Sequence, residues 1–403
     1  MGENESEKRR VVIVGGGVAG LEAALALRAI CGKRVEISMI APKDTSTYRP
    51  LAVAEPFGLA ESFEINLGTF AISQDVTLQI GEVDRVDAEA RTVHASTGTS
   101  YDFDYLILAP GAVRKPLLKD AISFADHEGV DQFKHLLYRL ERGEVRSIAF
   151  CAAANVGWFL PMYELALMTA TFAAERKAQA ELTVVTSESS PLAAFGTHSS
   201  ADVARLLEGA GIDLIEDRYP LDYASGELRL VPDGMVEVDE VVAMPQLEGP
   251  AISGLPTDQF GFIPVDESCR IKGREREFAV GDASNFPVKQ GGIAAQMAGA
   301  AVRSIAVDLG VLVDARAFRP TLDATLLTGK GAHHLRQTLV MGTSETSRHQ
   351  LSATWLPLAK VTAPFLVDYL ADHSDFPSGS GELAGDEIVR DLEGEWERSP
   401  DDG

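Results

Sequence analysis

Cysteine and long apolar runs are scarce in this sequence. Its 403 residues include three cysteines, Cys31, Cys151 and Cys269, which lie far apart and lack CxxC spacing. This number and spacing support neither a disulfide scaffold nor a zinc site, so a reducing compartment, the cytoplasm, is expected. No stretch reaches the roughly 18 apolar residues that a membrane-spanning helix needs. The charged N-terminus leads directly into a strand-like run and does not resemble a secretory signal.

Basic residues are few relative to acidic ones. The chain has 36 lysines and arginines against 60 aspartates and glutamates, which gives a net charge of −24. A field of this sign repels nucleic acid and anionic lipid, so nucleic-acid binding is discounted. The segment 373–403 is acidic and low in hydrophobicity, and we expect it to be a disordered tail.

Short apolar runs alternate with helical patterns along most of the chain. Residues 11–14 predict a buried parallel strand, residues 21–30 a helix and residues 35–40 the next strand. A second alternation of the same kind begins near residue 126, with helices predicted around 133–142 and over 201–209. The pattern predicts an α/β fold with two doubly wound sheets.

A glycine-rich turn follows the first predicted strand and precedes the first predicted helix. Gly15, Gly17 and Gly20 have the GxGxxG spacing of dinucleotide-binding proteins. The first glycine permits the tight turn, the second lets the backbone approach a diphosphate, and the third lets helix and strand pack closely. The acidic residue that usually binds the ribose about 20 positions later is missing, because that position falls at Ala41. Asp44 lies nearby and is the candidate substitute.

Three further motifs resemble those of flavoproteins with two dinucleotide-binding domains. The run 105–112 resembles the strand and turn that end their first FAD segment, although Pro110 departs from the usual Ala-Thr-Gly. The run 278–283, with Gly281 and Asp282, resembles their second FAD motif. The run 287–296 is similar to the segment beneath the flavin in sulfide:quinone oxidoreductases and type II NADH dehydrogenases, where a helix N-terminus favours the anionic reduced flavin.

The resemblance implies FAD as cofactor and two Rossmann-like domains, the second inserted in the first. It implies an FAD-binding domain over 9–112 and 255–330, a second NAD-binding-like domain over 113–254, and a small C-terminal region over 331–372. The residues that it assigns to the cofactor are Gly15, Gly17, Val18, Ala19, Gly20, Asp44, Arg49, Pro50, Val83, Ala109, Pro110, Gly111, Gly281, Asp282, Lys289, Gln290, Gly291, Gly292 and Ile293.

The second dinucleotide motif is degenerate. Nicotinamide-using relatives carry another GxGxxG after the strand at 147–150, but only Gly157 is present here, followed by Trp158. In the sulfide:quinone branch a redox-active cysteine stands where this chain has Trp158. Cys151 is a candidate catalytic thiolate, with a buried apolar role as the favoured alternative. Sulfide oxidation is therefore doubted.

Two other residues are catalytic candidates. Glu164 is expected beside the flavin, where it either contacts substrate or relays a proton, or else complements a helix dipole. Lys289 either stabilises negative charge near the flavin or is simply solvated. His333, His334 and His349 form no metal-like pattern and are expected at the surface or in packing.

The leading expectation is an FAD-dependent oxidoreductase that passes electrons from a small donor to a quinone-like acceptor. Trp355, Phe365 and Tyr369 either line an apolar quinone channel or cover the C-terminal edge of the core. An NAD(P)H dehydrogenase of the same fold and a flavin-binding partner protein without turnover are the alternatives. No metal is expected, whereas peripheral contact with the inner face of the membrane and a homodimer stay open.

Overall fold

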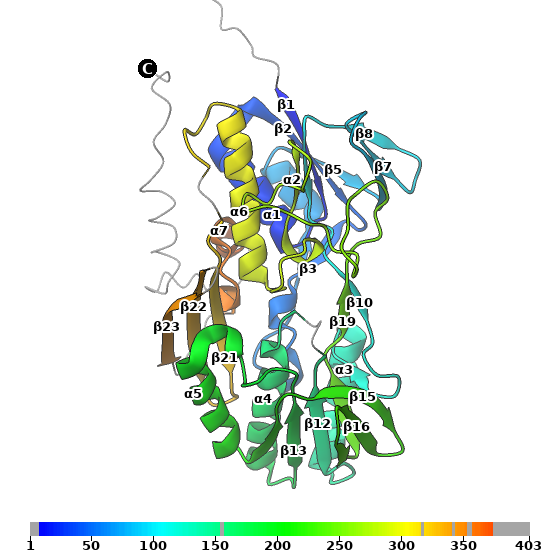
Figure 1. The fold of residues 1–403 in the computed structure, drawn as a ribbon, viewed down its shortest axis with the longest axis vertical. Coiled ribbons are helices and arrows are strands. Elements are labelled where there is room, and N and C mark those ends of the chain that lie inside the picture. Colours follow the sequence, from blue (N-terminus) through cyan, green and yellow to red (C-terminus); the bar gives the residue numbers. More distant parts are fainter. Residues whose placement is uncertain (1–7, 154–156, 316–317, 341–342, 353–356, 374–403) are drawn as a thin grey trace, which may run out of the picture.

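The computed structural model describes residues 8–153, 157–315, 318–340, 343–352 and 357–373. Two parallel five-stranded sheets organise this part of the chain, one above the other in Figure 1. The first sheet has the order β20-β9-β1-β2-β5, with bounds Glu277–Ala279, Tyr105–Leu108, Arg9–Val14, Val35–Ala41 and Val76–Ile80. The second has the order β11-β18-β12-β13-β14, with bounds Ile122–Ser123, Glu240–Ala243, Ser147–Cys151, Glu181–Val185 and Ile212–Ile215.

Strand β20 shows how the two sheets are connected. It follows every strand of the second sheet in the sequence, yet it pairs in parallel with β9 of the first. The second sheet is therefore inserted within the first. This confirms the predicted α/β class with two Rossmann-like sheets.

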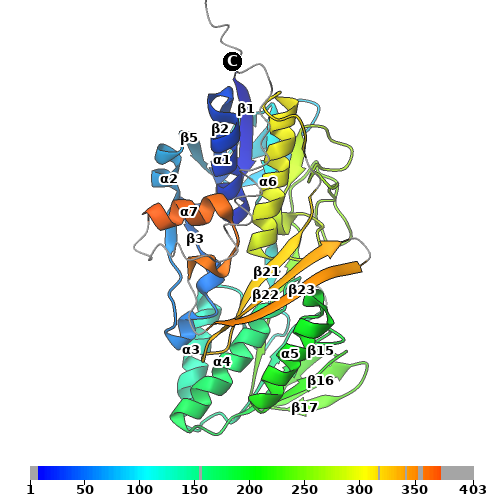
Figure 2. The same cartoon turned by 90° about the vertical axis from the view of Figure 1, so that its left-hand side faces the viewer.

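Helices cover the sheets and bring the two units together. Helices α1 (Val18–Cys31) and α6 (Gly291–Asp308) lie side by side on the first sheet, and α2 (Leu67–Ser73) lies near β5 (Figure 2). Helices α3 (His127–Glu141), α4 (Leu160–Arg176) and α5 (Gly196–Gly209) belong to the second unit. Buried residues of both units join one large apolar cluster. No helix of the described residues is long and apolar enough to cross a membrane.

Smaller sheets complete the two units. These are β3-β4 (Thr45–Thr47, Glu64–Asn66), β6-β7-β8 (Val83–Asp87, Thr92–Ala95, Ser100–Asp102), β10-β19 (Val113–Lys115, Gln246–Glu248) and β15-β16-β17 (Tyr219–Ala224, Glu227–Val231, Met235–Glu237). The sheet β21-β22-β23 (Thr321–Leu327, Ala332–Val340, Thr343–Ser352) lies between α6 and the helices α4 and α5 (Figure 2).

The helix α3 begins earlier than the sequence pattern indicates. The predicted helix starts near residue 133, whereas α3 starts at His127. Its start is fixed by Asp126, whose carboxylate accepts a hydrogen bond from the Gly129 N–H at 3.2 Å. A capping side chain of this kind satisfies one of the free N–H groups of the first turn.

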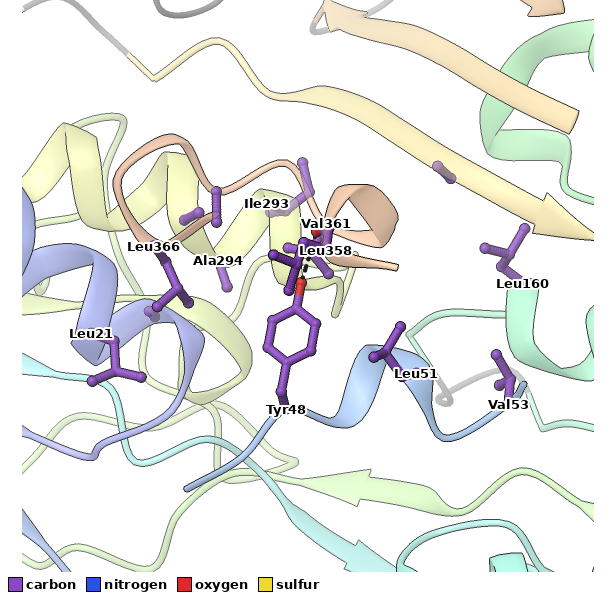
Figure 3. Packing of buried hydrophobic residues seen from close by; sticks show 14 of the residues in the cluster. Leu21, Tyr48, Leu51, Val53, Leu160, Ile293, Ala294, Leu358, Val361 and Leu366 are labelled. Carbon is purple, nitrogen blue, oxygen red and sulfur yellow. Dashed lines mark hydrogen bonds between the residues drawn. The ribbon is translucent and has the colours of Figure 1, made fainter. Parts of the chain in front are cut away.

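The segment 357–366, which we call the C-terminal strap, passes between the two units. Tyr48 is almost fully buried, and its hydroxyl donates to the Leu358 carbonyl at 3.1 Å (Figure 3). Ile293 and Val361 lie beside this contact, and Leu51 belongs to the same apolar cluster. This hydrogen bond fixes the strap to the first unit. The sequence pattern showed only an apolar stretch here and did not predict the contact.

Glu22 fixes the end of the strap to helix α1. Its carboxylate is buried and accepts hydrogen bonds from Leu366 N–H at 2.8 Å and Phe365 N–H at 3.3 Å, in the first turn of helix α7 (Pro364–His373). Two helices far apart in the sequence are joined by this carboxylate. Burial raises the pKa of Glu22 to about 7, against 4.5 ordinarily.

The raised pKa of Glu22 predicts how stability depends on pH. The folded state binds this proton more tightly than the unfolded state, so the carboxyl lowers stability progressively as the pH rises from about 4.5 to about 7. Glu22→Gln cannot ionise at this position. The difference in free energy of unfolding between Glu22→Gln and wild type is therefore expected to shift by about 3 kcal/mol in favour of the variant as the pH rises through this interval. Urea unfolding at about pH 4.5 and pH 8 measures the difference. Glu36→Gln, which removes an exposed carboxylate, is the control for the change in net charge. A constant difference between Glu22→Gln and wild type at both pH values contradicts this account.

Candidate functional site

A cavity of about 340 Å³ lies where the strands of the first sheet end, between helices α1, α4 and α6 and the C-terminal strap. Carboxyl ends of parallel strands are the usual place for ligands in such folds. Many of the residues expected at a cofactor line it: Val18, Ala19, Arg49, Pro50, Ala109, Gly111, Gly281, Asp282, Lys289, Gln290 and Gly291. Glu164 and Trp158 line it from the second unit, and Lys360 and Val361 from the strap.

The glycine turn at the start of α1 is shaped for close backbone packing. Gly15 has a φ of +109°, and a Cβ added there would lie 2.1 Å from the Ala109 carbonyl oxygen. A Cβ on Gly20 would lie 2.0 Å from the Gly15 carbonyl oxygen. A Cβ on Gly17 would meet no described protein atom within 4 Å. Gly15 and Gly20 are therefore required by the fold, whereas the space at Gly17 is open to a ligand.

Two helix N-termini face this region of the molecule. Helix α1 has no side-chain cap, so its first N–H groups keep their capacity to bind an anion. Helix α6 is capped by Gln290, whose Oε1 accepts from the Ile293 N–H at 2.9 Å and whose Nε2 donates to the Asp323 carbonyl at 2.9 Å. Val361 of the strap lies against Gly291, where a Cβ would be 3.0 Å from its side chain.

Asp282 places a carboxyl group among three cations. Burial raises its pKa, while the charges of Arg114, Lys289 and Arg49 oppose the rise. Arg49 begins the short 3₁₀ helix Arg49–Leu51 that follows β3, and Arg114 lies in β10. Such a cluster of cations beside a helix N-terminus suits a ligand that carries phosphate groups.

Lys289 is held in place rather than freely solvated. Its Nζ donates to the Asp282 carbonyl at 3.2 Å and to the Ser284 carbonyl, and lies 3.8 Å from the centre of the Phe262 ring. Burial lowers the pKa of Lys289 to about 8, against 10.5 ordinarily. An ammonium group of this pKa can lose or gain a proton near neutral pH.

Glu164 and Lys360 form a buried ion pair at the cavity wall. Both side chains are almost fully buried, and Lys360 Nζ donates to Glu164 Oε1. Glu164 Oε1 also accepts from the Leu327 N–H at 3.0 Å, and Lys360 Nζ donates to the Thr325 carbonyl at 2.5 Å. Glu164 Oε2 is buried without a hydrogen-bond partner among the described residues. Burial raises the pKa of Glu164 and lowers the pKa of Lys360, while the charge of each partner opposes the shift of the other.

The sequence profile of the pyridine nucleotide-disulphide oxidoreductases matches residues 9–301. The chain belongs to the pyridine nucleotide-disulphide oxidoreductase family. Rhodocoxin reductase from Rhodococcus erythropolis is 29% identical over 297 residues, which cover 69% of this chain and 65% of that protein, slightly less than two thirds of it. An NADH dehydrogenase-like protein from Mycobacterium tuberculosis is 30% identical over 35% of this chain and 37% of its own length. The type II NADH:quinone oxidoreductase of the same species is 26% identical over 71% of this chain and 69% of its own length.

Solved structures of other proteins share this fold. The sulfide:quinone oxidoreductase of Aquifex aeolicus superimposes with a TM-score of 0.80 at 19% identity, and the match covers 95% of both chains. A ferredoxin reductase from Rhodopseudomonas palustris superimposes with a TM-score of 0.61 at 20% identity, covering 82% of this chain and 83% of that one. The resemblance stated from the sequence motifs is thereby confirmed at the level of family and fold.

Some residues that the sequence predicted at the site of this protein do not line the cavity. Asp44 and Val83 are not among the residues that line the cavity, and the Asp44 carbonyl accepts a hydrogen bond from Leu67 N–H at 2.9 Å. Cys151 is fully buried in an apolar cluster with strands β15 and β16, and burial raises its pKa to about 12. Pro110, Gly292 and Ile293 adjoin residues of the cavity wall. Gly292 lies close to the Gln290 side chain and the Thr362 carbonyl.

The C-terminal aromatic residues contribute to packing. Phe365 packs against the apolar core, and the Tyr369 ring meets the Phe70 ring edge-on with centroids 5.1 Å apart. Neither of them lines the cavity. Trp355 and the acidic tail lie outside the described residues.

Two basic residues of the cavity, Lys360 and Arg114, were not predicted from the sequence. Lys360 is the one basic residue in the apolar stretch 351–370, and an isolated charge in such a stretch is the signal that points to a buried partner. Arg114 follows the run 105–112 by two residues and carries no pattern of its own. The described residues contain no cluster of histidine, cysteine and acidic side chains that could hold a metal ion.

Proposed function

We propose that this protein is an FAD-dependent oxidoreductase that passes electrons from a small donor to a quinone-like acceptor. The observation that carries the proposal is the buried Glu164–Lys360 pair in the wall of the cavity that the FAD motifs line. A quinone needs protons as well as electrons to become a quinol. A buried acid–base pair beside the electron carrier supplies protons where water is excluded.

The residues present fit FAD. The open space at Gly17, the uncapped start of α1 and the nearby Arg49 suit its diphosphate. Gly281 has a φ of +66°, and its added Cβ would lie 3.2 Å from Ala294 and 3.3 Å from Ala19, so the backbone approaches the cavity closely there. FAD, when bound, accepts two electrons from a donor and passes them to an acceptor.

The protein's own groups then hold charge and protons. The Lys289 ammonium group, held by the Asp282 and Ser284 carbonyls, places positive charge beside the start of α6, where it stabilises negative charge on a ligand. Lys360 and Glu164 hold one exchangeable proton between them in a buried site. The Leu327 N–H and the Thr325 carbonyl keep the pair in position, so the proton is released at a fixed place.

Thiol chemistry has little support in this chain. Burial raises the pKa of Cys31 to about 11 and that of Cys151 to about 12, and it also raises the pKa of Cys269. All three side chains are buried, and none lines the cavity. A thiolate that attacks sulfur must be exposed to its substrate and ionised. The donor is therefore proposed to reduce FAD without a protein thiol.

A cysteine variant tests this part of the proposal. Cys151→Ala is expected to leave the rate of reoxidation by a quinone within about twofold of wild type, because the thiol packs on the far side of its strand. Stopped-flow absorbance of the flavin measures the rate. A loss of about a hundredfold or more, the size expected for a catalytic group, would assign Cys151 a catalytic role instead.

The NAD(P)H dehydrogenase alternative has support from the names of the mycobacterial relatives. The second sheet offers a poor site for a nicotinamide dinucleotide. Glu188, the acidic residue after β13, accepts hydrogen bonds from the Tyr163 hydroxyl at 2.8 Å and from the N–H groups of Leu192 and Ala193 at 3.3 and 3.1 Å. A carboxylate used in this way is not free to bind a ribose.

The turn before α4 is also used for packing. A Cβ on Gly157 would lie 2.4 Å from Lys289 Cγ, so this glycine accommodates a side chain rather than a phosphate. The Trp158 ring packs against Phe195 with centroids 5.8 Å apart. Anaerobic mixing of the FAD-loaded protein with about millimolar NADH or NADPH tests whether a nicotinamide is the donor. This concentration suffices because such enzymes work at micromolar to millimolar substrate. Prompt bleaching of the flavin would establish the dehydrogenase alternative.

The experiment that tests the proposed function is a single turnover without any donor. FAD-loaded protein is reduced with light under anaerobic conditions and then mixed with a short-chain quinone. We expect the flavin absorbance to return, with one quinol formed per FAD. Protein that binds FAD but is reoxidised by none of several quinones would instead be a flavin-binding partner without turnover.

A further inference from the structure

The start of helix α4 forms a wall of the cavity that the FAD motifs do not account for. Trp158, Leu160, Pro161 and Glu164 line the cavity from this helix and from the turn before it. The residues that fit FAD, at the glycine turn and in the run 278–283, belong instead to the first unit. Three apolar side chains and one acid make up the α4 wall, a composition that suits an apolar ligand with an oxygen substituent.

Trp158 gives this wall a flat aromatic face. Of the described residues that line the cavity, it is the only aromatic one. The side chain is half-buried, and its ring packs on the fully buried Phe195 with centroids 5.8 Å apart. An indole presents a broad apolar face on which a second planar ring can stack. Since Trp158 also lines the cavity, its uncovered surface is available there to a planar ligand.

The turn that carries Trp158 is held against the start of helix α6. The Lys289 N–H donates a hydrogen bond to the Gly157 carbonyl at 3.0 Å. Gly157 has a φ of +76°, and a Cβ added there would lie 2.4 Å from Lys289 Cγ, so the two segments are in close contact. The indole is therefore fixed before any ligand binds, which lowers the cost of ordering it on binding.

Glu164 supplies a polar atom that the fold leaves without a partner. The residue lies about one helical turn after Leu160, and its side chain is fully buried. Oε1 accepts hydrogen bonds from Lys360 Nζ and the Leu327 N–H, whereas Oε2 has no hydrogen-bond partner among the described residues. Buried polar atoms without a partner are rare and call for an explanation. A hydroxyl group on a ligand in the cavity supplies the missing donor.

The electrostatics of the α4 start also suit a ligand oxygen. The helix has no side-chain cap at its N-terminus. The partial positive charge of a helix N-terminus stabilises negative charge nearby. Such charge develops on the oxygen of a carbonyl compound while it accepts electrons, so the helix favours reduction of a ligand held there.

We propose that the quinone-like acceptor binds at the start of α4, with its ring stacked on Trp158 and one ring oxygen directed at Glu164 Oε2. The ligand class is a planar, apolar ring with oxygen substituents. In the quinol product the ring hydroxyl donates to the carboxylate oxygen, and a quinone carbonyl accepts from the same atom when it is protonated. This inference rests on the proposed function, and it makes Trp158 a residue that determines acceptor specificity.

The first test measures binding without turnover. The chain has three tryptophans, so in Trp355→Phe/Trp396→Phe only Trp158 emits tryptophan fluorescence. A short-chain quinone is titrated into this variant in its oxidised, FAD-loaded form, and we expect saturable quenching because the quinone ring lies against the indole. Trp158→Leu, which keeps the other two tryptophans, measures non-specific quenching and light absorption by the quinone.

Two outcomes of this titration overturn the proposal. One is quenching of Trp158 that stays proportional to the quinone concentration, as it does in the Trp158→Leu control. The other is saturable quenching by NADH or NADPH with none by the quinone, which would assign this surface to a nicotinamide.

The second test follows reoxidation of photoreduced, FAD-loaded protein at increasing concentrations of the quinone. Trp158→Leu is expected to raise the half-saturating concentration about tenfold, the size expected for loss of an aromatic contact. The maximal rate is expected to stay within about threefold, because the contact holds the acceptor equally before and during its reduction. Trp158→Phe keeps a stacking surface and should recover most of the loss. Phe172→Leu is the matched control, since Phe172 is a half-buried aromatic of the same helix that does not line the cavity.

The flavin itself provides the remaining comparison. Altered flavin absorption bands or weaker FAD binding in Trp158→Leu, with an unchanged half-saturating quinone concentration, would show that Trp158 contacts the cofactor and would contradict the proposal. If wild-type protein is reoxidised by no quinone, the proposed function fails. The fluorescence titration then still decides whether a planar ring binds at Trp158.

Discussion

Replacing Glu164 with glutamine is expected to slow reoxidation of the reduced protein by a quinone about a hundredfold or more. Glutamine has nearly the same shape but cannot hold or release the proton that Glu164 shares with Lys360. FAD binding is expected to survive, because the glycine turn and Asp282 are untouched. Anaerobic stopped-flow absorbance measures the rate, and the flavin spectrum before reduction measures occupancy.

Lys360→Met and the double variant separate catalysis from folding. Glu164→Gln and Lys360→Met each leave one buried charge without its counter-charge. Breaking a buried ion pair in this way costs about 3–5 kcal/mol of stability. Glu164→Gln/Lys360→Met is expected to regain most of that stability but none of the rate. If the double variant reduces quinone at the wild-type rate, the pair is structural only and the proposed proton source is wrong.

Gly17→Ala is expected to weaken FAD binding about a hundredfold or more while leaving the fold intact, because a methyl group would occupy the space into which a diphosphate fits. No described protein atom lies within 4 Å of that Cβ, and the backbone at Gly17 is extended, which alanine adopts freely. Stability without FAD should fall by about 1 kcal/mol or less, the usual effect at a helix N-cap. Equilibrium titration with FAD and thermal unfolding of the apoprotein measure the two effects.

Gly20→Ala is the matched comparison. Its Cβ would lie 2.0 Å from the Gly15 carbonyl oxygen, so helix α1 would have to move away from β1. This variant is expected to lose FAD binding and stability together. Wild-type affinity for FAD in Gly17→Ala would contradict the placement of the diphosphate at this turn.

The fold and the glycine turn could be predicted because their signals are local. A β-branched strand, three spaced glycines and an Ala-rich helix follow one another within 25 residues, and each of these features is read directly from the sequence. The starts of α3 and α5 were predicted too late, since their first turns depend on a cap and on flanking packing rather than on apolar periodicity. Of these, only Asp126 carried a visible capping signal.

The polar half of the site could not be predicted because it is assembled from distant segments. Lys360 meets Glu164 across 196 residues of sequence, and no periodic pattern joins a helix of the second unit to the C-terminal strap. Glu164 was singled out, but its partner decides whether it is a dipole-complementing surface acid or a buried proton carrier. Helix α4 is apolar on nearly every side, so a glutamate in its second turn requires a buried partner.

The most direct test of this account is the visible spectrum of the purified protein after addition of excess FAD and gel filtration. We predict the absorption bands of oxidised flavin at one FAD per chain, and colourless protein for Gly17→Ala treated in the same way. A folded wild-type protein that stays colourless and shows no FAD-dependent rise in melting temperature would contradict the assignment of this cavity to FAD.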